Sequence, residues 1–241
     1  MKRTERHHLK ENEVAEWVLG AKDWFEENRN AVTYGGIAIV VLAIAVFATM
    51  AWRDSTASRA NRMLAQAMAV ADAPVTPPAA ATEAGQTPVQ QPGTYPTERA
   101  RLEAALPQFM AVAEAYPSSQ AGIVARYRAA SALVGLGRTD EALQRYQEVV
   151  DRATGVYQAM ARLGIADACL ASGQYDKAIS AFQDVVANHP EDAPLDGVLM
   201  ELGRAYRLAG KSDDAAKAFK RVTDEFPQSP YAAQARRELE S

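Results

Sequence analysis

The spacing of hydrophobic residues changes along this chain, and its first clear feature is a continuous apolar run. From Asn30 to Trp52 there are 23 residues without a charge, bracketed by Arg29 and Arg53. At about 1.5 Å per residue, a helix of this length spans a hydrocarbon core of about 30 Å. The pattern predicts a single membrane-spanning helix, with Ala31 and Trp52 near its ends.

Two other interpretations fit this run less well. A buried core helix seldom lacks charge for so long, and a cleaved signal peptide has a shorter leader and a shorter apolar core. Here the leader covers residues 1–29, and the small residues Ala43 and Ala45 lie inside the run instead of after it. An uncleaved anchor is therefore predicted.

The distribution of Lys and Arg predicts the orientation of this anchor. The leader contains Lys2, Arg3, Arg6, Lys10, Lys22 and Arg29. The first twenty residues after the run contain Arg53, Arg59 and Arg62. Since the more basic flank stays in the cytoplasm, the remainder of the chain is expected outside it. In a Gram-negative cell this places the protein in the inner membrane, with its C-terminal part in the periplasm.

The leader has a helical pattern of its own. One face is apolar and consists of Val14, Trp17, Val18, Ala21, Trp24 and Phe25. The opposite face is mainly acidic. Two interpretations remain open, a helix that docks on the cytoplasmic surface of a partner and a helix that lies in the membrane interface.

Two contrasting segments follow the apolar run. Residues 54–73 have small and apolar side chains at three- and four-residue spacing, which predicts an amphipathic helix. Residues 74–96 hold six prolines and no basic residue, and they offer little to pack, which is typical of a flexible linker.

A short pattern then recurs four times between residues 97 and 228. Its central alanines lie 37, 36 and 37 residues apart, at Ala105, Ala142, Ala178 and Ala215. An aromatic residue stands four positions after each, at Phe109, Tyr146, Phe182 and Phe219. A glycine stands five positions before the last three, at Gly137, Gly173 and Gly210. A period of this size indicates stacked supersecondary units.

The chemistry of the pattern is that of a helix–turn–helix. Gly173 suits the left-handed residue that ends one helix, and Asp176 suits the start of the next. Ala178 leaves room for a close helix crossing, and the ring of Phe182 fills the space beside it. Pro190 is expected to end the second helix.

The first and last parts of this array differ from the others. The copy at Ala105 has only a second helix nearby, so residues 55–73 are predicted to supply its first helix from across the linker. Residues 229–241 are predicted to form a capping helix. Its inward positions are Ala232, Ala235 and Leu239.

The remaining composition points away from catalysis. The net charge of −4 gives no signal for nucleic acid, and no nucleotide, zinc or nucleophile motif occurs. His7 and His8 lie in a charged tail, His189 lies in a turn, and Cys169 falls on an inward helical face. We expect neither enzymatic activity nor a cofactor nor a metal ion, and the single cysteine leaves the redox compartment open.

These repeats resemble the tetratricopeptide repeat family. The best matching unit has the family's residues at Leu202, Gly203, Tyr206, Gly210, Ala215, Phe219 and Pro227. Elsewhere Cys169 replaces the tyrosine and Thr154 the proline, and each unit exceeds the family period of about 34 residues. The resemblance implies an all-α fold, in which one transmembrane helix precedes a helical-repeat solenoid.

The resemblance also implies a groove lined by the first helix of each unit. The lining positions that it assigns are Val124, Tyr127, Ser131, Met160, Leu163, Asp167, Met200, Arg204 and Arg207. The alternative is that several of these side chains pack against neighbouring helices.

The whole arrangement is similar to that of the ancillary subunits of the bacterial Sec translocon. That resemblance implies association with translocon subunits, periplasmic chaperones and exported polypeptides. Two other hypotheses remain: a scaffold for an envelope or cell-division complex, and a regulator whose repeats lie in the cytoplasm.

Overall fold

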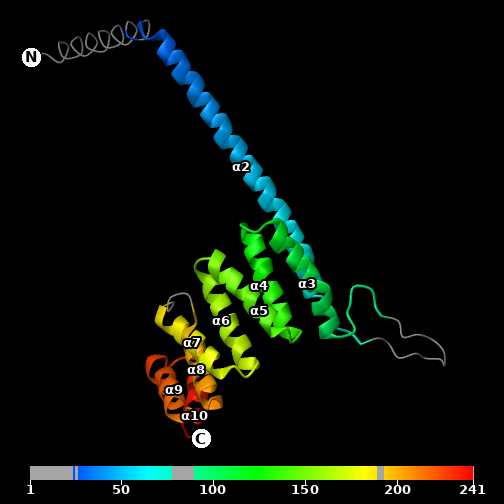
Figure 1. Ribbon diagram of the computed structural model, residues 1–241, viewed down its shortest axis with the longest axis vertical. Helices are drawn as coiled ribbons and strands as arrows, with labels where there is room; N and C mark the ends of the chain where they lie inside the picture. Colours follow the sequence, from blue (N-terminus) through cyan, green and yellow to red (C-terminus); the bar gives the residue numbers. More distant parts are fainter. Residues whose placement is uncertain (1–23, 25–26, 78–89, 189–192, 241) are drawn as a thin grey trace, which may run out of the picture. The chain divides into compact units, whose positions relative to one another are not determined.

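The protein is described from a computed structural model, which covers residue 24 and residues 27–77, 90–188 and 193–240. Apart from one isolated β-bridge, the regular elements in these ranges are helices (Figure 1). Their bounds are α2 Arg29–Ala71, α3 Glu98–Ala115, α4 Gln120–Gly135, α5 Thr139–Arg152, α6 Val156–Ala171, α7 Tyr175–Asn188, α8 Leu195–Leu208, α9 Ser212–Glu225 and α10 Ala232–Glu240. The predicted all-α repeat fold is confirmed.

The chain divides into two units, the first ending at Thr56 and the second beginning at Ala57. The first unit contains the apolar part of α2, and its large side chains are exposed all around the helix, including Ile39, Leu42 and Phe47. By length and composition this stretch is able to cross a membrane, although a signal sequence near an N-terminus passes the same test. The sequence pattern predicts separate elements for residues 30–53 and 54–73, whereas α2 runs through both ranges.

The second unit is a stack of antiparallel helices. Each helix from α3 to α10 packs against the next one along the chain, and α4 also packs against α6 (Figure 1). The buried residues form three clusters distributed along the stack instead of one central core. This is the packing expected when each unit buries its apolar face on its neighbours.

The repeated glycines end the first helix of each unit, as predicted. Gly137, Gly173 and Gly210 have φ values of 75°, 75° and 74°. Each donates its N–H to a carbonyl three residues earlier, and the following N–H reaches five residues back. This is the Schellman motif, which requires the left-handed conformation that glycine adopts without strain.

The repeated aspartates stand at the start of the next helix, as predicted, but they are not its N-cap residues. Asp140, Asp176 and Asp213 lie inside the first turn, and the N-cap residues of α5 and α9 are Arg138 and Lys211. Neither of these caps makes a side-chain hydrogen bond. The aspartates therefore contribute through their negative charge near the positive end of the helix dipole.

The small and large residues of the pattern are buried as predicted. The alanines Ala105, Ala142, Ala178 and Ala215 are at most 2% exposed. The aromatic residues four positions later, Phe109, Tyr146, Phe182 and Phe219, are at most 4% exposed. Close helix crossings at alanine thus leave space that the aromatic rings fill.

The end of α2 packs against α3 within the second unit. Ala67 belongs to the same buried cluster as Ala105 and Phe109, and Met63 and Met68 pack against that cluster. The ends of the intervening segment are also held together. Arg101 donates Nη1 to the carbonyl of Ala73 at 3.1 Å, the N–H of Tyr95 donates to Pro74, and the N–H of Thr76 donates to Tyr95. Because the end of α2 meets the start of α3, the two helices run antiparallel.

The last helix, α10, covers the end of the stack with two of its three predicted inward residues. Ala232 and Ala235 are buried, but Leu239 is 40% exposed, so its predicted inward position is wrong. This residue lies in the final turn, where it lines a pocket beside Arg207 and Ala215 instead of being buried. The leader face from Val14 to Ala21, the interior of the linker, and His189 and Pro190 lie outside the described residues.

Candidate partner-binding groove

The first helices of three successive units, α4, α6 and α8, carry one exposed position in register. Ser131, Asp167 and Arg204 are 36 and 37 residues apart, the same spacing as the repeat, and all three are exposed. We call these three residues the open line, since they are accessible members of the set that the sequence assigns to a groove. The side chain at this position differs from repeat to repeat: it carries a hydroxyl, then a carboxylate, then a guanidinium.

The position four residues earlier faces neighbouring helices instead. Tyr127 and Leu163 are partly buried, and Met200 is only 2% exposed within the core around α7, α8 and α9. The prediction that Met200 lines the groove is therefore wrong, because its side chain is used for packing. A partner is able to reach Tyr127 and Leu163 only at their edges.

The outermost predicted positions differ from each other. Val124 is partly buried on α4, whereas Met160 on α6 is 36% exposed. Met160 therefore offers an adaptable apolar contact near one end of α6.

Arg207 is directed at the last helix. Its Nη1 pairs with the carboxylate of Glu238, and its Nη2 donates to the carbonyl of Glu238 at 2.5 Å. Its guanidinium also lies 5.1 Å from the ring centre of Phe219. Arg207 thus holds α10 on the stack, a role that the groove prediction did not include.

A pocket of about 350 Å³ opens between α6 and α8. It includes two of the predicted positions, Asp167 and Arg204, and its other lining residues are Leu170, Ala171, Glu201 and Leu208. Leu208 is 55% exposed, which is unusual for a leucine within a helical stack. The pocket therefore combines apolar walls with charged groups, the composition common in recognition sites.

The charged groups of this pocket are not equally satisfied. Arg204 donates Nη1 to both carboxylate oxygens of Glu201, at 2.9 and 3.2 Å. The carboxylate of Asp167 makes no hydrogen bond or ion pair with any residue in the described part of the chain. Partial desolvation, and then the negative charge of Glu201, raise the pKa of Asp167 to about 6.

Aromatic groups adjoin the pocket on the α4 side. The rings of Tyr127 and Tyr146 lie 5.5 Å apart at an interplanar angle of 59°. Burial raises the pKa of both phenols, and the charge of Asp167 adds to this effect. The nearby hydroxyl of Ser131 acts in the opposite sense and lowers the pKa of Tyr146. The ring contact of Tyr127 with Tyr146 joins α4 to α5 here.

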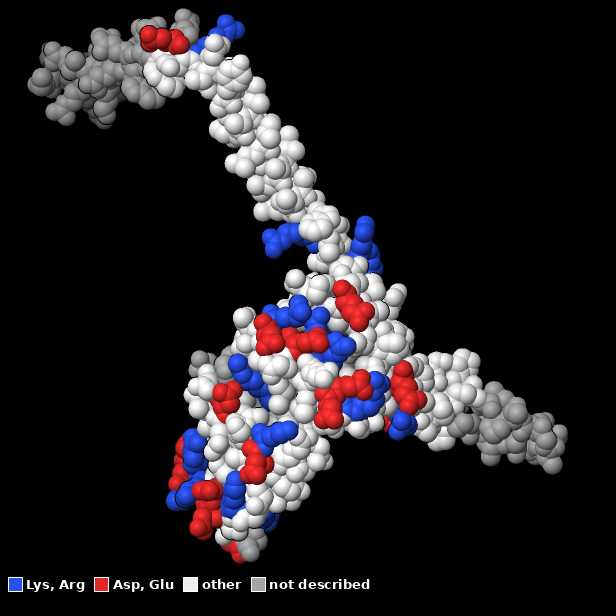
Figure 2. Space-filling model, in the orientation of Figure 1, with Lys and Arg blue, Asp and Glu red and all other residues white. Residues whose placement is uncertain are grey.

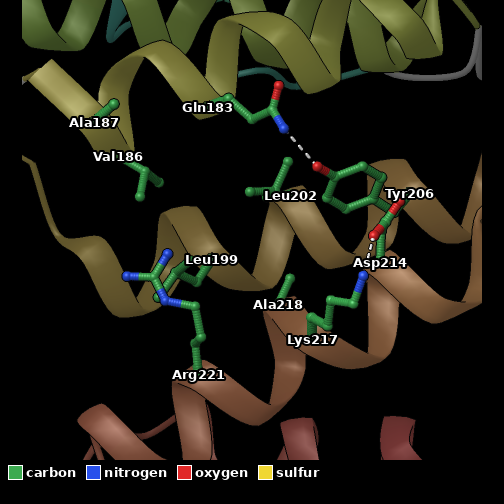
Figure 3. A pocket seen from close by; sticks show the side chains of 10 residues that line it. All are labelled: Gln183, Val186, Ala187, Leu199, Leu202, Tyr206, Asp214, Lys217, Ala218 and Arg221. Atoms are coloured by element: carbon green, nitrogen blue, oxygen red, sulfur yellow. Dashed lines mark hydrogen bonds and ion pairs between the residues drawn. The ribbon is translucent and has the colours of Figure 1, made fainter.

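A second pocket of about 340 Å³ lies between α7, α8 and α9 (Figure 3). Its polar side chains pair with one another: Gln183 donates to the phenol of Tyr206 at 2.6 Å, and Lys217 donates to Asp214 at 2.8 Å. Arg221 is likewise paired, with Glu225. The polar groups at this pocket are thus already satisfied.

Acidic and basic side chains are mixed on the face of the molecule shown in Figure 2. They alternate over the solenoid, and on this face none lies along the apolar stretch of α2. Among the described residues, no group of three or more His, Cys, Asp or Glu is arranged to hold a metal ion. Cys169 is 2% exposed, and burial raises the pKa of its thiol, as expected of a packing residue.

Comparison with known proteins identifies the class of the repeats. Residues 127–193 and 170–239 match two family models, both described as Tetratricopeptide repeat. No curated relative matches the chain. Residues 127–239 therefore carry tetratricopeptide-type repeats, a fold that typically serves as a non-catalytic protein–protein interaction module.

Similar folds occur among solved structures. The nearly identical TPR-like repeats of a Podosopora anserina protein, assigned as a kinesin light chain, align with a TM-score of 0.50 at 18% identity. That alignment covers 58% of this chain and 76% of the other. The crystal structure of MamA aligns with a TM-score of 0.47 at 18% identity, over 58% of this chain and 75% of MamA.

Proposed function

We propose that this chain is a membrane-anchored protein-interaction module that serves protein export. In this proposal its repeat groove associates with translocon subunits, periplasmic chaperones and exported polypeptides, and so assists secreted or envelope proteins as they emerge. The proposal rests on the combination of two features in one chain. The first is a fully exposed apolar stretch of helix, and the second is a set of tetratricopeptide-type repeats with an open line of side chains.

The exposed stretch supports the membrane part of the proposal. Residues such as Ile39, Leu42 and Phe47 are 66–75% exposed, and they point in different directions around the helix. An apolar surface on every side of a helix is costly in water but is matched by lipid. In this proposal the helix tethers the repeats to the membrane.

The orientation follows from the basic residues of the leader. With the leader in the cytoplasm and the solenoid in the periplasm, the anchor lies in the bacterial inner membrane as a single span. An alkaline phosphatase fusion after Glu240 tests this arrangement. We expect high phosphatase activity together with an N-terminal epitope that stays in the membrane fraction. An inactive fusion contradicts the orientation, and loss of the epitope by cleavage contradicts the anchor.

We also propose that α3 and the end of α2 form the first repeat of the array, interrupted by the linker. The shared cluster around Ala67, Ala105 and Phe109 supports this assignment. The hydrogen bonds that close the base of the linker allow an insertion without opening the helix pair.

Affinity purification of the full chain in mild detergent tests the partners. Mass spectrometry is expected to recover translocon subunits with the wild-type chain, and less of them with Asp167→Arg, which alters the open line without touching the core. Recovery of division or envelope-assembly proteins alone contradicts the export proposal and supports the scaffold alternative. Glu114→Arg, on the exposed surface of α3, is the control for an equal change in surface charge.

A further inference from the structure

The pocket between α6 and α8 contains a carboxylate that lacks a counter-charge. In the described part of the chain the carboxylate of Asp167 has no ion pair or hydrogen bond, although it lines a pocket between α6 and α8. The charge that acts on the Asp167 carboxylate is the negative charge of Glu201 on α8, and Asp167 in turn raises the pKa of the phenols of Tyr127 on α4 and Tyr146 on α5.

Arg204, the cationic residue in the pocket lining, does not neutralise the charge of Asp167. Arg204 is held by Glu201, so the three charged groups of the pocket sum to −1 when both acids are ionised. The unbalanced charge belongs to Asp167. A bound cation would relieve the repulsion that the free groove sustains.

The walls of the pocket define what should carry that cation. Leu170 and Leu208 present aliphatic surface, and Leu208 is 55% exposed although neighbouring helices are close by. A volume of about 350 Å³ accommodates one long side chain with its flanking atoms. Lysine and arginine have an apolar stem and a charged end, and therefore match both features.

We propose that this pocket binds a lysine or arginine side chain of a polypeptide segment whose neighbouring residues are apolar. The cationic end pairs with Asp167, and the apolar residues cover Leu170 and Leu208. The proposal rests on the groove function proposed above and specifies the chemistry of the segment that the groove selects.

Binding of defined peptides to the full chain tests this inference. The chain is placed in phosphatidylcholine nanodiscs, which carry no net charge, and the probe is a fluorescent capped peptide of alternating leucine and lysine. A peptide with glutamate in place of each lysine is the charge-swapped probe. Asp167→Asn removes the carboxylate, and Glu114→Gln, on the exposed surface of α3, is the matched change in net charge.

We expect the lysine peptide to bind the wild-type chain and Glu114→Gln equally, and Asp167→Asn about tenfold more weakly, the loss typical of a charge-assisted contact. The glutamate peptide should bind none of them. Affinity of the wild-type chain should also fall as Asp167 is protonated below its pKa of about 6. In Asp167→Asn the part of this pH dependence that comes from Asp167 should be absent, and the part that comes from Glu201 should remain.

Equal binding of the lysine peptide to wild type and Asp167→Asn would overturn the proposal, as would its failure to bind or equal binding of the charge-swapped peptide. These outcomes are separable from the function itself. If the groove still captures export proteins in membranes, the function stands and only the assigned chemistry of the segment fails.

Discussion

Gly203 of α8 lies directly against the ring of Phe219 in α9. A Cβ at residue 203 would stand 2.4 Å from Cε1 and 2.7 Å from Cδ1 of that ring. Phe219 is 0% exposed and also carries the guanidinium of Arg207 near its face. The two helices of this unit are therefore separated by the thickness of one aromatic ring.

Adding a single methyl group at this crossing should destabilise the solenoid. Gly203→Ala forces the ring of Phe219 or the backbone to move, and overpacking of this kind costs about 1–3 kcal/mol. Urea denaturation of the full chain in detergent, followed by circular dichroism, should show an earlier midpoint. Gly35→Ala adds the same methyl group where nothing lies within 4 Å, and it should leave the midpoint unchanged.

The helix-ending glycines should be sensitive for a different reason. No atom lies within 4 Å of a Cβ at Gly210, so an added side chain has space. The left-handed conformation at φ 74° nevertheless disfavours alanine by about 1 kcal/mol. Gly210→Ala should lower the melting temperature and Gly210→Asn should lower it less, since asparagine tolerates this region. Equal effects of the two substitutions would argue against a conformational cause.

The pH dependence of stability should report on Asp167. Because its folded pKa of about 6 is above the usual value of 3.8, the folded state binds this proton more tightly than the unfolded state. The contribution is therefore favourable below the lower pKa and is lost as pH rises through the higher one. Since one side of the residue is open to water, the effect should be small.

Asp167→Asn should thus be slightly more stable than wild type at neutral pH, and the difference should vanish in acid. Thermal melts of both proteins across this range provide the measurement. A variant less stable than wild type at neutral pH would show that the carboxylate stabilises the free chain, and would contradict its assignment as an unbalanced charge.

The pair formed by Arg126 and Glu148 should contribute more than the surface pairs. Arg126 is 5% exposed, its Nε lies 2.9 Å from Oε2 of Glu148, and its Nη2 donates to the carbonyl of Ala113 at 3.0 Å. Glu148→Gln leaves a buried cation without a full counter-charge and should cost about 2 kcal/mol, less than a fully buried pair because Glu148 is partly exposed.

The control for that substitution is an exposed pair. Glu141→Gln breaks the contact with Arg138, in which both side chains are about half exposed, and should change stability by less than about 0.5 kcal/mol. Chemical denaturation compares the two variants. Equal losses would contradict the distinction between the buried and the exposed pair.

Much of the fold could be predicted from the sequence because the repeated residues act on neighbours that are close to them in the chain. The glycines that end helices and the alanine–aromatic pairs act within one helix–turn–helix, so their roles at Gly173, Ala178 and Phe182 follow from spacing alone. The groove was harder to predict. Ser131, Asp167 and Arg204 are exposed in the structure, and their assignment to a partner groove stays a prediction.

The errors arose where distant residues decide the environment. Met200 is buried by side chains of α7 and α9. Arg207 forms an ion pair with Glu238, which lies 31 residues further along the chain. Glu201 and Leu208 were missed as pocket residues. Their spacing of three and four from Arg204 could have identified them, because such residues share one face of a helix.

Site-specific photo-crosslinking in native membranes tests the central claim most directly. A photoreactive amino acid is placed at Met160 or Arg204 in the groove, and at Gln147 on an exposed face of α5 as the control. We expect the groove positions to capture translocon subunits, periplasmic chaperones or exported polypeptides, and Gln147 to capture none of them. Absence of these products, or the same products from the control position, would contradict the proposed function.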